Sequence, residues 1–260
     1  MSDLVRDLFT RPKPVVAVIH AGPSPGVPGF RSVRAAVDRA VAEARLLVEL
    51  GVDGLLVENA HDAPALDDEE TGPEVVAYMT RIAVAVRRNA DRLPVGVRVL
   101  RADRAALAVA LGAGCHFVRV DGWAKDPTHA ARFHRYRESL DASPIPVLAD
   151  IRPSGPDDVA GLVTAAEAAR PDGLIILGPA VGEPSTPEAV EAACRTASLP
   201  LFCGGGLDGT NLLDYVDAAD GFLVGSGLKE ERRWQAPVCE PFVRQLVGAV
   251  EYVRGQEVRQ

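Results

Sequence analysis

Carboxylates placed directly after apolar, strand-like segments are the first candidates for chemistry in this 260-residue sequence. Glu58 follows residues 55–57, and Asp150 follows residues 147–149. Apolar surroundings raise the pKa of a carboxyl group toward neutrality, where the group can act as a general acid or base. We therefore predict Glu58 and Asp150 as a catalytic acid–base pair. In an alternative that stays open, both are held by arginines in a structural ring.

Other polar residues follow the same kind of segment. His20 is a candidate to carry a proton or to hydrogen-bond a substrate; the alternative is that it only orients a neighbouring group. The predicted substrate-binding residues are Asn59, Asp62, Arg98, Arg119 and Asp121. In the structural alternative, the cations that hold Glu58 and Asp150 are Arg98, Arg119 and Arg152.

Glycine-rich segments near the C-terminus are the second candidate site. Gly204-Gly205-Gly206 and Gly225-Ser226-Gly227 each follow an apolar run. Glycine turns let backbone N–H groups converge on an anion, and the N-terminus of a helix adds attraction. The predicted phosphate-binding residues are Gly178, Gly204, Gly205, Gly206, Gly225 and Ser226. The alternative is that these glycines only relieve backbone strain.

Strand-like and helix-like segments alternate along the whole chain and must position these residues. The eight expected strands lie near 15–19, 54–57, 95–99, 117–120, 147–149, 174–177, 201–202 and 222–224. This alternation predicts an α/β fold, a single (β/α)8 TIM barrel over residues 1–260, with 1–13 as an N-terminal extension. Barrel active sites lie at the C-terminal ends of the strands, and phosphate is bound after the seventh and eighth strands.

The residues that precede the strands follow a finer pattern. A proline precedes the first, third, fifth and seventh strands, and Asp-Gly precedes or begins three of the other four. Cys115-His116 is the exception. The pattern predicts a quarter-barrel unit of two strands and two helices, repeated four times. Asp103 and Asp208 are expected to cap the third and seventh helices.

The composition excludes several classes of partner. The chain has 36 acidic and 28 basic residues and a net charge of −8, whereas nucleic acid and anionic membranes attract cationic surfaces. No apolar run is long enough to span a bilayer, and the N-terminal residues lack a signal-peptide pattern. We expect a cytoplasmic protein without nucleic-acid partner or membrane insertion, and a homo-oligomer is left open.

Metal and Schiff-base chemistry have little support in the sequence. His20, Glu58, Asp62 and Asp150 could supply ligands for a cation such as Mg²⁺, but no two of them form a ligand motif. We therefore expect that no cofactor is required, with Mg²⁺ left open and no protein metal site. The three lysines, Lys13, Lys125 and Lys229, all lie away from the strand ends. The acidic run at 67–70 is expected to be a solvated loop or helix start.

Several segments together resemble the BtpA/SgcQ family of (β/α)8-barrel proteins. The matching segments are 18–20 with the loop after it, 51–59 with 62–64, 94–101 with Asp103, 117–120, 148–150, 219–225 and 228–229. The resemblance implies a barrel and a cytoplasmic location; one branch of the family is linked to photosystem I biogenesis and another to sugar-metabolism gene sets. The chain departs from the family pattern at 121–124, 151–155 and 204–206. We expect an altered active-site rim.

These features predict an enzyme that acts on a small phosphorylated metabolite, such as a sugar or nucleoside phosphate. The expected chemistry is acid–base catalysis by an isomerase, an epimerase or an aldolase-like lyase. Two alternatives stay open: a non-catalytic assembly or biogenesis factor of the BtpA type, and a glycosyl- or prenyl-transferring barrel enzyme. An assembly factor needs an exposed apolar patch, for which the candidate is a helix containing Trp234, Phe242 and Val243.

Overall fold

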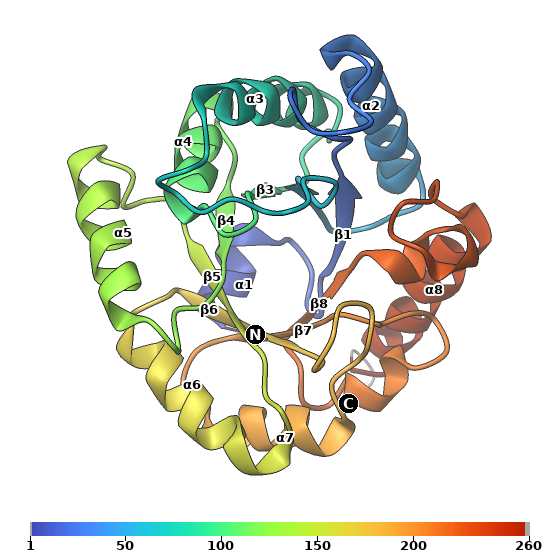
Figure 1. Cartoon of the computed structure of the whole chain (residues 1–260). Helices are drawn as coiled ribbons and strands as arrows, with labels where there is room; N and C mark the ends of the chain where they lie inside the picture. The colour runs from blue at the N-terminus through green and yellow to red at the C-terminus, as the bar shows by residue number, and fades with distance from the viewer. Residues whose placement is uncertain (1, 258–260) are drawn as a thin grey trace.

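The computed structural model describes residues 2–257, and its eight parallel strands close into a barrel (Figure 1). The strands are β1 (Val15–His20), β2 (Gly54–Glu58), β3 (Val95–Arg98), β4 (Phe117–Val120), β5 (Val147–Ile151), β6 (Gly173–Leu177), β7 (Leu201–Gly204) and β8 (Gly221–Val224). Each strand pairs in parallel with its neighbour in the chain, and β1 pairs with β8 to close the sheet. The predicted TIM barrel is confirmed.

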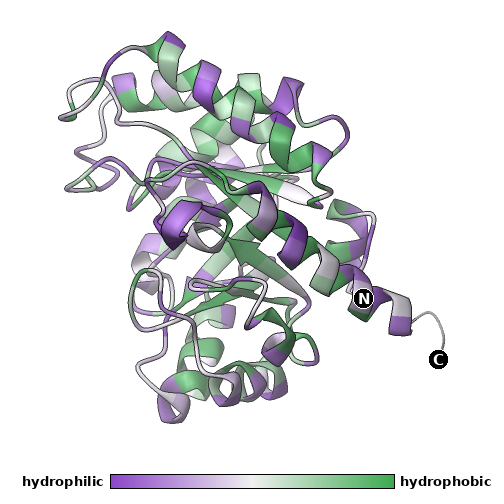
Figure 2. Cartoon of the chain, turned by 90° about the vertical axis from the view of Figure 1, so that its right-hand side faces the viewer, coloured by the Kyte–Doolittle hydropathy of each residue, from purple (hydrophilic) through white to green (hydrophobic). Residues whose placement is uncertain are grey.

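Helices surround the barrel, and the hydrophobic strands lie inside (Figures 1 and 2). The helices are α1 (Asp3–Leu8), α2 (Val33–Glu49), α3 (Pro73–Arg88), α4 (Asp103–Ala113), α5 (Pro127–Ser139), α6 (Val159–Ala168), α7 (Pro187–Thr196) and α8 (Glu240–Glu257). Short 3-10 turns are η1 (Pro156–Asp158), η2 (Leu212–Tyr215), η3 (Ser226–Leu228) and η4 (Glu230–Arg232). Within residues 2–257, every helix is too short or too polar to cross a bilayer.

The expected caps of two helices are corrected by the structure. Asp103 is the first residue of α4, and its carboxylate accepts a hydrogen bond from Trp123 Nε1 at 2.9 Å. The N-terminus of α4 is instead capped by Asp68, whose Oδ1 accepts a hydrogen bond from the backbone N–H of Arg104 at 2.9 Å. The acidic run at 67–70, expected as a solvated loop or helix start, therefore also holds a helix. After β7 the chain forms only the 3-10 turn η2, and Asp208 caps no α-helix.

The inside of the barrel changes from apolar to polar along the strands. Alternate residues of a strand face the same side. Inward-facing Val16 and Val18 of β1 belong to an apolar cluster with residues from the other strands. Two residues further on, the same rows end in polar side chains at the C-terminal edge: His20, Glu58, Arg98, Arg119 and Asp150. Strand periodicity therefore collects the predicted residues at one end of the barrel.

The other end of the barrel is closed by α1, which lies behind the barrel centre in Figure 1. Phe9, just after this helix, packs against Phe117 and Phe202 with ring centroids 6.3 and 5.9 Å away. Val5 and Phe9 belong to the same apolar cluster as the lower barrel interior. Residues 3–9, expected only as part of an extension, thus seal the N-terminal end, and a cavity can open only at the C-terminal end.

One kind of hydrogen bond recurs at the beginning of the odd-numbered strands. The Oδ2 atoms of Asp53, Asp172 and Asp220 accept from the backbone N–H groups of Val15, Val147 and Leu201 at 2.8, 2.8 and 2.9 Å. At the exception, His116 Nδ1 accepts from Val95 N–H at 2.9 Å. These bonds explain why an aspartate, or a histidine at the exception, precedes each even-numbered strand: its side chain accepts a hydrogen bond from the beginning of the neighbouring odd-numbered strand. The repeat of four equivalent units stays a prediction, and η2 interrupts its two-helix pattern.

Candidate active site

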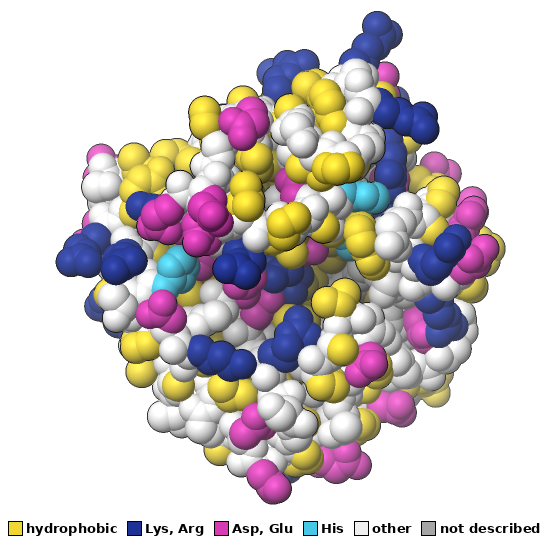
Figure 3. Space-filling view, viewed as in Figure 1, with side chains coloured by type: hydrophobic (Ala, Val, Ile, Leu, Met, Phe, Trp, Pro, Cys, Tyr) yellow, Lys and Arg dark blue, Asp and Glu magenta, His cyan; other side chains and the backbone are white. Residues whose placement is uncertain are grey.

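A cavity of about 650 Å³ opens at the C-terminal ends of the strands. Its base is apolar, formed by Val18, Leu177 and Leu223. Lys and Arg side chains gather around the hollow at the centre of this face in Figure 3. The polar and glycine residues that line it are His20, Glu58, Arg98, Arg119, Arg152, Gly182, Gly205, Gly206, Gly225, Ser226, Arg232, Arg233 and Gln235. The C-terminal glycine turns and Glu58 therefore face one cavity.

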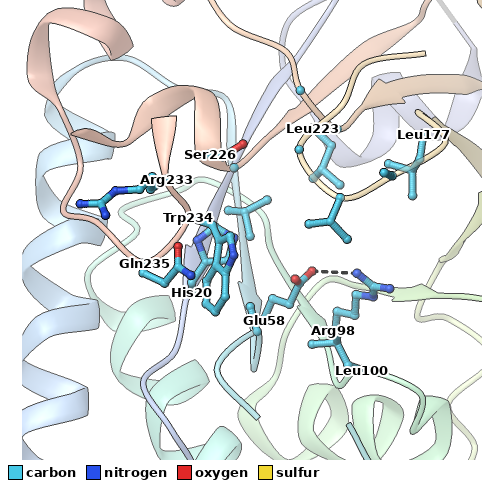
Figure 4. Close-up of a pocket in the computed structure, with 18 of the residues that line it drawn as sticks. His20, Glu58, Arg98, Leu100, Leu177, Leu223, Ser226, Arg233, Trp234 and Gln235 are labelled. Carbon is cyan, nitrogen blue, oxygen red and sulfur yellow. Dashed lines mark hydrogen bonds and ion pairs between the residues drawn. The ribbon is translucent and has the colours of Figure 1, made fainter. Parts of the chain in front are cut away.

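Five predicted residues form an ion-pair network on the β2–β5 side of the cavity. Glu58 Oε2 accepts hydrogen bonds from Nη1 of Arg98 and Nη1 of Arg119, both at 3.1 Å (Figure 4 shows the first). Arg119 also donates two hydrogen bonds to Asp150, at 2.8 and 2.9 Å. Arg98 donates to Asp121 at 2.6 Å. The arginine ring considered as a structural alternative is present for Arg98 and Arg119.

The network sets the charge of Glu58. Burial would raise the pKa of this carboxyl group, but the guanidinium groups of Arg98 and Arg119 outweigh burial and lower the pKa to about 2. The expectation that burial brings this pKa toward neutrality is wrong. Glu58 is ionised at neutral pH, so it has no proton to donate as a general acid.

Asp150 lies apart from the main cavity. Both of its oxygens accept hydrogen bonds from Arg119, and its side chain lines a smaller side pocket of about 220 Å³. The guanidinium of Arg119 lies between Asp150 and Glu58 and bonds to both. The predicted acid–base pair is therefore corrected: the two carboxylates share an arginine instead of facing a common substrate.

His20 lies next to Glu58 in the sheet and faces the main cavity. The two residues are paired in the β1–β2 register. The His20 side chain is only 7% exposed, and burial lowers its pKa to about 4, so the ring is neutral at pH 7. Its Nδ1 atom is buried and has no hydrogen-bond partner within the described residues, so it is out of reach of a molecule in the cavity. A neutral imidazole could accept a proton there only through its other nitrogen, Nε2.

The turns after β7 and β8 present backbone to the cavity. Gly206 has φ +62°, and a Cβ there would lie 2.3 Å from the nitrogen of Pro184, so the turn requires glycine. Within residues 2–257, the N–H groups of Gly206, Gly225 and Ser226 donate to no other part of the chain. The predicted helix N-terminus is missing, because η2 and η3 are only short 3-10 turns. Attraction for an anion must come from these N–H groups and nearby arginines.

Two of the six predicted phosphate residues lie outside the cavity lining. Gly204 is the last residue of β7, and a Cβ there would contact Leu177 at 3.1 Å inside the barrel. At Gly178 a Cβ would lie 2.0 Å from the carbonyl oxygen of Glu183, so the loop after β6 folds tightly over this glycine. Both glycines serve close packing, as in the alternative interpretation.

Asn59 and Asp62 hold loops together and do not line the cavity. Asp62 accepts hydrogen bonds from the backbone and hydroxyl of Ser24 at 2.8 and 2.6 Å, and from Asn59 at 2.9 Å. Asn59 accepts in turn from the N–H of Leu100 at 2.8 Å. Both residues are buried. The prediction that they bind substrate is corrected: they join the loops after β1, β2 and β3 beneath the rim.

The end of η4 and the segment before α8 contribute cavity residues that the sequence analysis did not predict for the site. Arg232, Arg233 and Gln235 line the cavity together with Trp234, which was considered only for an apolar helix and whose ring lies beside His20 in Figure 4. The two ring centroids are 5.8 Å apart. These residues have no strand or helix period, so only their position after β8 could have indicated them.

The apolar helix considered for an assembly factor does not exist as predicted. Trp234 lies before α8, which begins at Glu240, and Val243 is fully buried. Phe242 is covered by the guanidinium of Arg232 at 5.5 Å from the ring centroid. The three residues therefore do not form one exposed patch.

The four residues considered as ligands for a cation do not converge: His20 and Glu58 are neighbours in the sheet, but the other two are held elsewhere. Asp62 is occupied by Ser24 and Asn59, and Asp150 by Arg119. Across the described part of the chain, no three His, Cys, Asp or Glu side chains are grouped as a metal site requires. The expectation of a cofactor-independent protein stays a prediction.

Comparisons with known proteins agree with the barrel. The sequence model described as the BtpA family matches residues 11–252. The photosystem I biogenesis protein BtpA of Synechocystis sp. is 35% identical over 240 residues, which cover 85% of this chain and 82% of that protein.

Two solved structures have similar backbones. One is (S)-3-O-geranylgeranylglyceryl phosphate synthase of Thermoplasma acidophilum in complex with sn-glycerol-1-phosphate, with a TM-score of 0.63, 13% identity and coverage of 96% of this chain and 97% of that chain. The other is 3-hexulose-6-phosphate synthase of Salmonella typhimurium, with a TM-score of 0.63, 14% identity and coverage of 92% and 99%. At these identities the similarity shows the shared fold.

Proposed function

The chain belongs to the BtpA family, and from that premise we propose that it is an enzyme acting on a small phosphorylated metabolite, such as a sugar or nucleoside phosphate. One observation carries the proposal: the glycine turns after β7 and β8 line the same cavity as His20 and Glu58. A phosphate bound at the turns would hold the rest of the substrate against these two side chains. Fixed orientation of this kind lowers the barrier to reaction.

The charges around the cavity favour an anionic substrate. The lining includes five arginines and one carboxylate, Glu58. Arg98 and Arg119 are paired with carboxylates, as are Arg232 with Asp208 and Arg233 with Glu231, whereas Arg152 forms no ion pair within residues 2–257. Arginine side chains and unpaired backbone N–H groups are the groups that bind phosphate in proteins. In this proposal Gly205, Gly206, Gly225 and Ser226 hold the phosphate. Gly178 and Gly204 have no part in it.

The proposed chemistry is proton transfer next to a carbonyl group. Neutral His20 takes a proton from the substrate, and the ionised Glu58 beside it stabilises the imidazolium that forms. Arg98 and Arg119 stabilise the negative charge that develops on the substrate oxygen. A general base contributes about 10²–10⁴ in rate. Isomerisation, epimerisation and aldolase-like cleavage all use this step.

The named ligands of the barrels with similar backbones support the choice of substrate. One is an enzyme solved with sn-glycerol-1-phosphate, and the name of the other states a hexulose 6-phosphate product. Prenyl transfer has less support, because a prenyl chain needs a long apolar channel and this cavity ends on Val18, Leu177 and Leu223 above the sealed base. Glycosyl transfer stays an alternative reaction at the same site.

A second candidate function is favoured by one relative. The Synechocystis protein is named for photosystem I biogenesis, so a non-catalytic assembly role is the competing proposal. Such a role requires neither phosphate binding at the turns nor a proton acceptor at His20. The two candidates therefore differ in their response to small phosphorylated ligands.

Thermal unfolding with a panel of ligands tests the proposal. The panel contains inorganic phosphate, sugar phosphates and nucleoside monophosphates, each with and without Mg²⁺. We expect phosphorylated ligands to raise the melting temperature, since a ligand that binds only the folded state stabilises it. A Ser226→Asp variant, which adds a negative charge to the turn after β8, should lose this effect. Ser139→Asp on α5 is the matched control.

Turnover of a ligand found in this way tests the chemistry. We expect Glu58→Gln and His20→Gln to reduce turnover by about 10² or more, with binding of the phosphorylated ligand retained. A uniformly flat thermal response would favour the assembly role. Ligand binding that Ser226→Asp does not weaken would refute the proposed phosphate site.

A further inference from the structure

Arg152 differs from the other two arginines that follow the central strands. Arg98 and Arg119 are both held by carboxylates in the buried network. Arg152 is half-buried and borders both cavities, yet within residues 2–257 it forms no ion pair. Its hydrogen bond goes to the carbonyl oxygen of Gly178, which carries no net charge. A partly desolvated cation without a counter-ion is a site for an anion.

The side pocket beside Arg152 offers room for such an anion. It has a volume of about 220 Å³ and lies over the ends of β4 and β5, with Arg98 and Arg152 on the boundary shared with the main cavity. Lys125 also lines it and forms no ion pair within the described chain. The acidic residues of the pocket, Asp121 and Asp150, are already bonded to Arg98 and Arg119.

Arg98 and Arg119 carry two positive charges against the three negative charges of Glu58, Asp121 and Asp150. Arg152 and Lys125 therefore leave the whole group with one net positive charge, and neither is in direct contact with a carboxylate within residues 2–257. The glycine turns after β7 and β8 lie elsewhere on the rim, and no residue of these turns lines the side pocket. A molecule that lies across the mouth would reach both places, because the two cavities share Arg98 and Arg152.

We propose that Arg152 and Lys125 form a second anion site, and that the substrate carries two anionic groups, one at each end. The first group is the phosphate at the glycine turns, so this part of the inference rests on the proposed function. The second group, a phosphate or a carboxylate, binds in the side pocket. The substrate class is then a sugar bisphosphate or a phosphorylated sugar acid rather than a sugar monophosphate.

Phosphate counting by equilibrium dialysis with radiolabelled inorganic phosphate at low ionic strength tests the second site. We expect the wild-type chain to approach two bound phosphates at saturation. Arg152→Met should hold one, at the glycine turns, and Ser226→Asp should hold one, in the side pocket. Arg152→Lys keeps the charge and should still hold two. Arg195→Met, which removes an exposed charge on α7, is the matched control and should also hold two.

The outcomes separate the two sites. If Arg152→Met binds as much phosphate as the wild type, the second site is refuted while the proposed function stands. If Ser226→Asp binds as much as the wild type and Arg152→Met binds less, the phosphate site of the proposed function fails and the side pocket stands. A wild-type chain that binds none overturns both.

Two further measurements complete the test. If Arg152→Met does not fold, as judged by its circular dichroism spectrum, the exposed Lys125→Met replaces it and should weaken binding of the second phosphate at least about threefold. Acetate added as a competitor distinguishes the two anions: displacement of only the second phosphate indicates a carboxylate group, and no displacement indicates a second phosphate group.

Discussion

The two halves of the barrel mouth are built in opposite ways. On the β2–β5 side the inward rows end in Glu58, Arg98, Arg119 and Asp150, and these charges compensate one another through hydrogen bonds of 2.8–3.1 Å. On the β7–β8 side the strands run into glycine turns, which present backbone N–H groups that donate to nothing within residues 2–257. The charged half is paired except for the buried Nε of Arg98, whereas the glycine half leaves its N–H groups without partners among the described residues.

The difference separates side chains that the protein already fixes from a backbone surface that is open to an anion. Side chains whose charges are already paired are costly to rearrange, so the β2–β5 half keeps its geometry whether or not a ligand is present. Unpaired N–H groups gain most from an anion, because only a hydrogen bond to water, and none within the protein, is exchanged when it binds. Arg152 stands between the halves as a cation on the charged side without an ionic partner.

Removal of Arg119 should have the largest effect on stability. Arg119→Met leaves Glu58 with only Arg98, and it leaves Asp150 with only its longer contact to Arg98 at 3.5 Å, so one arginine must compensate buried carboxylates that two compensated before. We expect the free energy of unfolding to fall by about 3–5 kcal/mol. Urea denaturation measures it, with the exposed Arg195→Met as control, expected within about 0.5 kcal/mol of the wild type. A loss below 1 kcal/mol would show that the network is not a support.

Burial of His20 should change the free energy of unfolding by a smaller amount, and this amount should depend on pH. Its pKa falls from 6.5 to about 4 on folding, because burial disfavours the charged ring. The His20 ring therefore binds a proton more readily in the unfolded chain than in the folded one. The contribution of His20 to folding stability is fully present above pH 6.5 and is lost as the pH falls toward 4. The shift corresponds to about 3 kcal/mol at most.

Unfolding free energies of the wild type and His20→Gln, measured from pH 7 to pH 4, test this prediction. The difference between the two proteins should change across that window in the direction that favours the variant at low pH. A constant difference would mean that His20 is not held neutral by burial, and its proposed role as a proton acceptor at neutral pH would lose its basis.

Ser226→Asp should have the smallest effect on stability. Ser226 is half-buried in the turn after β8, and its side chain makes no hydrogen bond among the described residues. We expect a change in unfolding free energy within about 0.5 kcal/mol, as for most surface substitutions. The same denaturation experiment measures it. A loss comparable to that of Arg119→Met would mean that both halves of the mouth are structural supports.

The barrel could be predicted from the sequence because its signals are local and repeated. Strand length, alternation with helices and the prolines before odd strands all act over a few residues. The same alternation correctly placed His20, Glu58 and Arg98 on one rim, since residues two apart on a strand face the same side.

The charge states and several roles could not be predicted, because they depend on contacts far apart in the chain. The pKa of Glu58 is set by Arg98 and Arg119, which follow it by 40 and 61 positions. Asp62 resembles a rim ligand in sequence, yet it binds the Ser24 loop, 38 positions earlier. Trp234 reaches the cavity from an irregular segment, where no periodic pattern reveals orientation.

Amide chemical shifts during a phosphate titration test the central claim most directly, namely that the glycine turns bind phosphate in front of His20 and Glu58. In ¹⁵N-labelled protein, the amides of Gly206, Gly225 and Ser226 should shift together with one dissociation constant, and those near Arg195 at the end of α7 should not move. Saturable binding confined to amides elsewhere, or no shift at the turns, would contradict the claim.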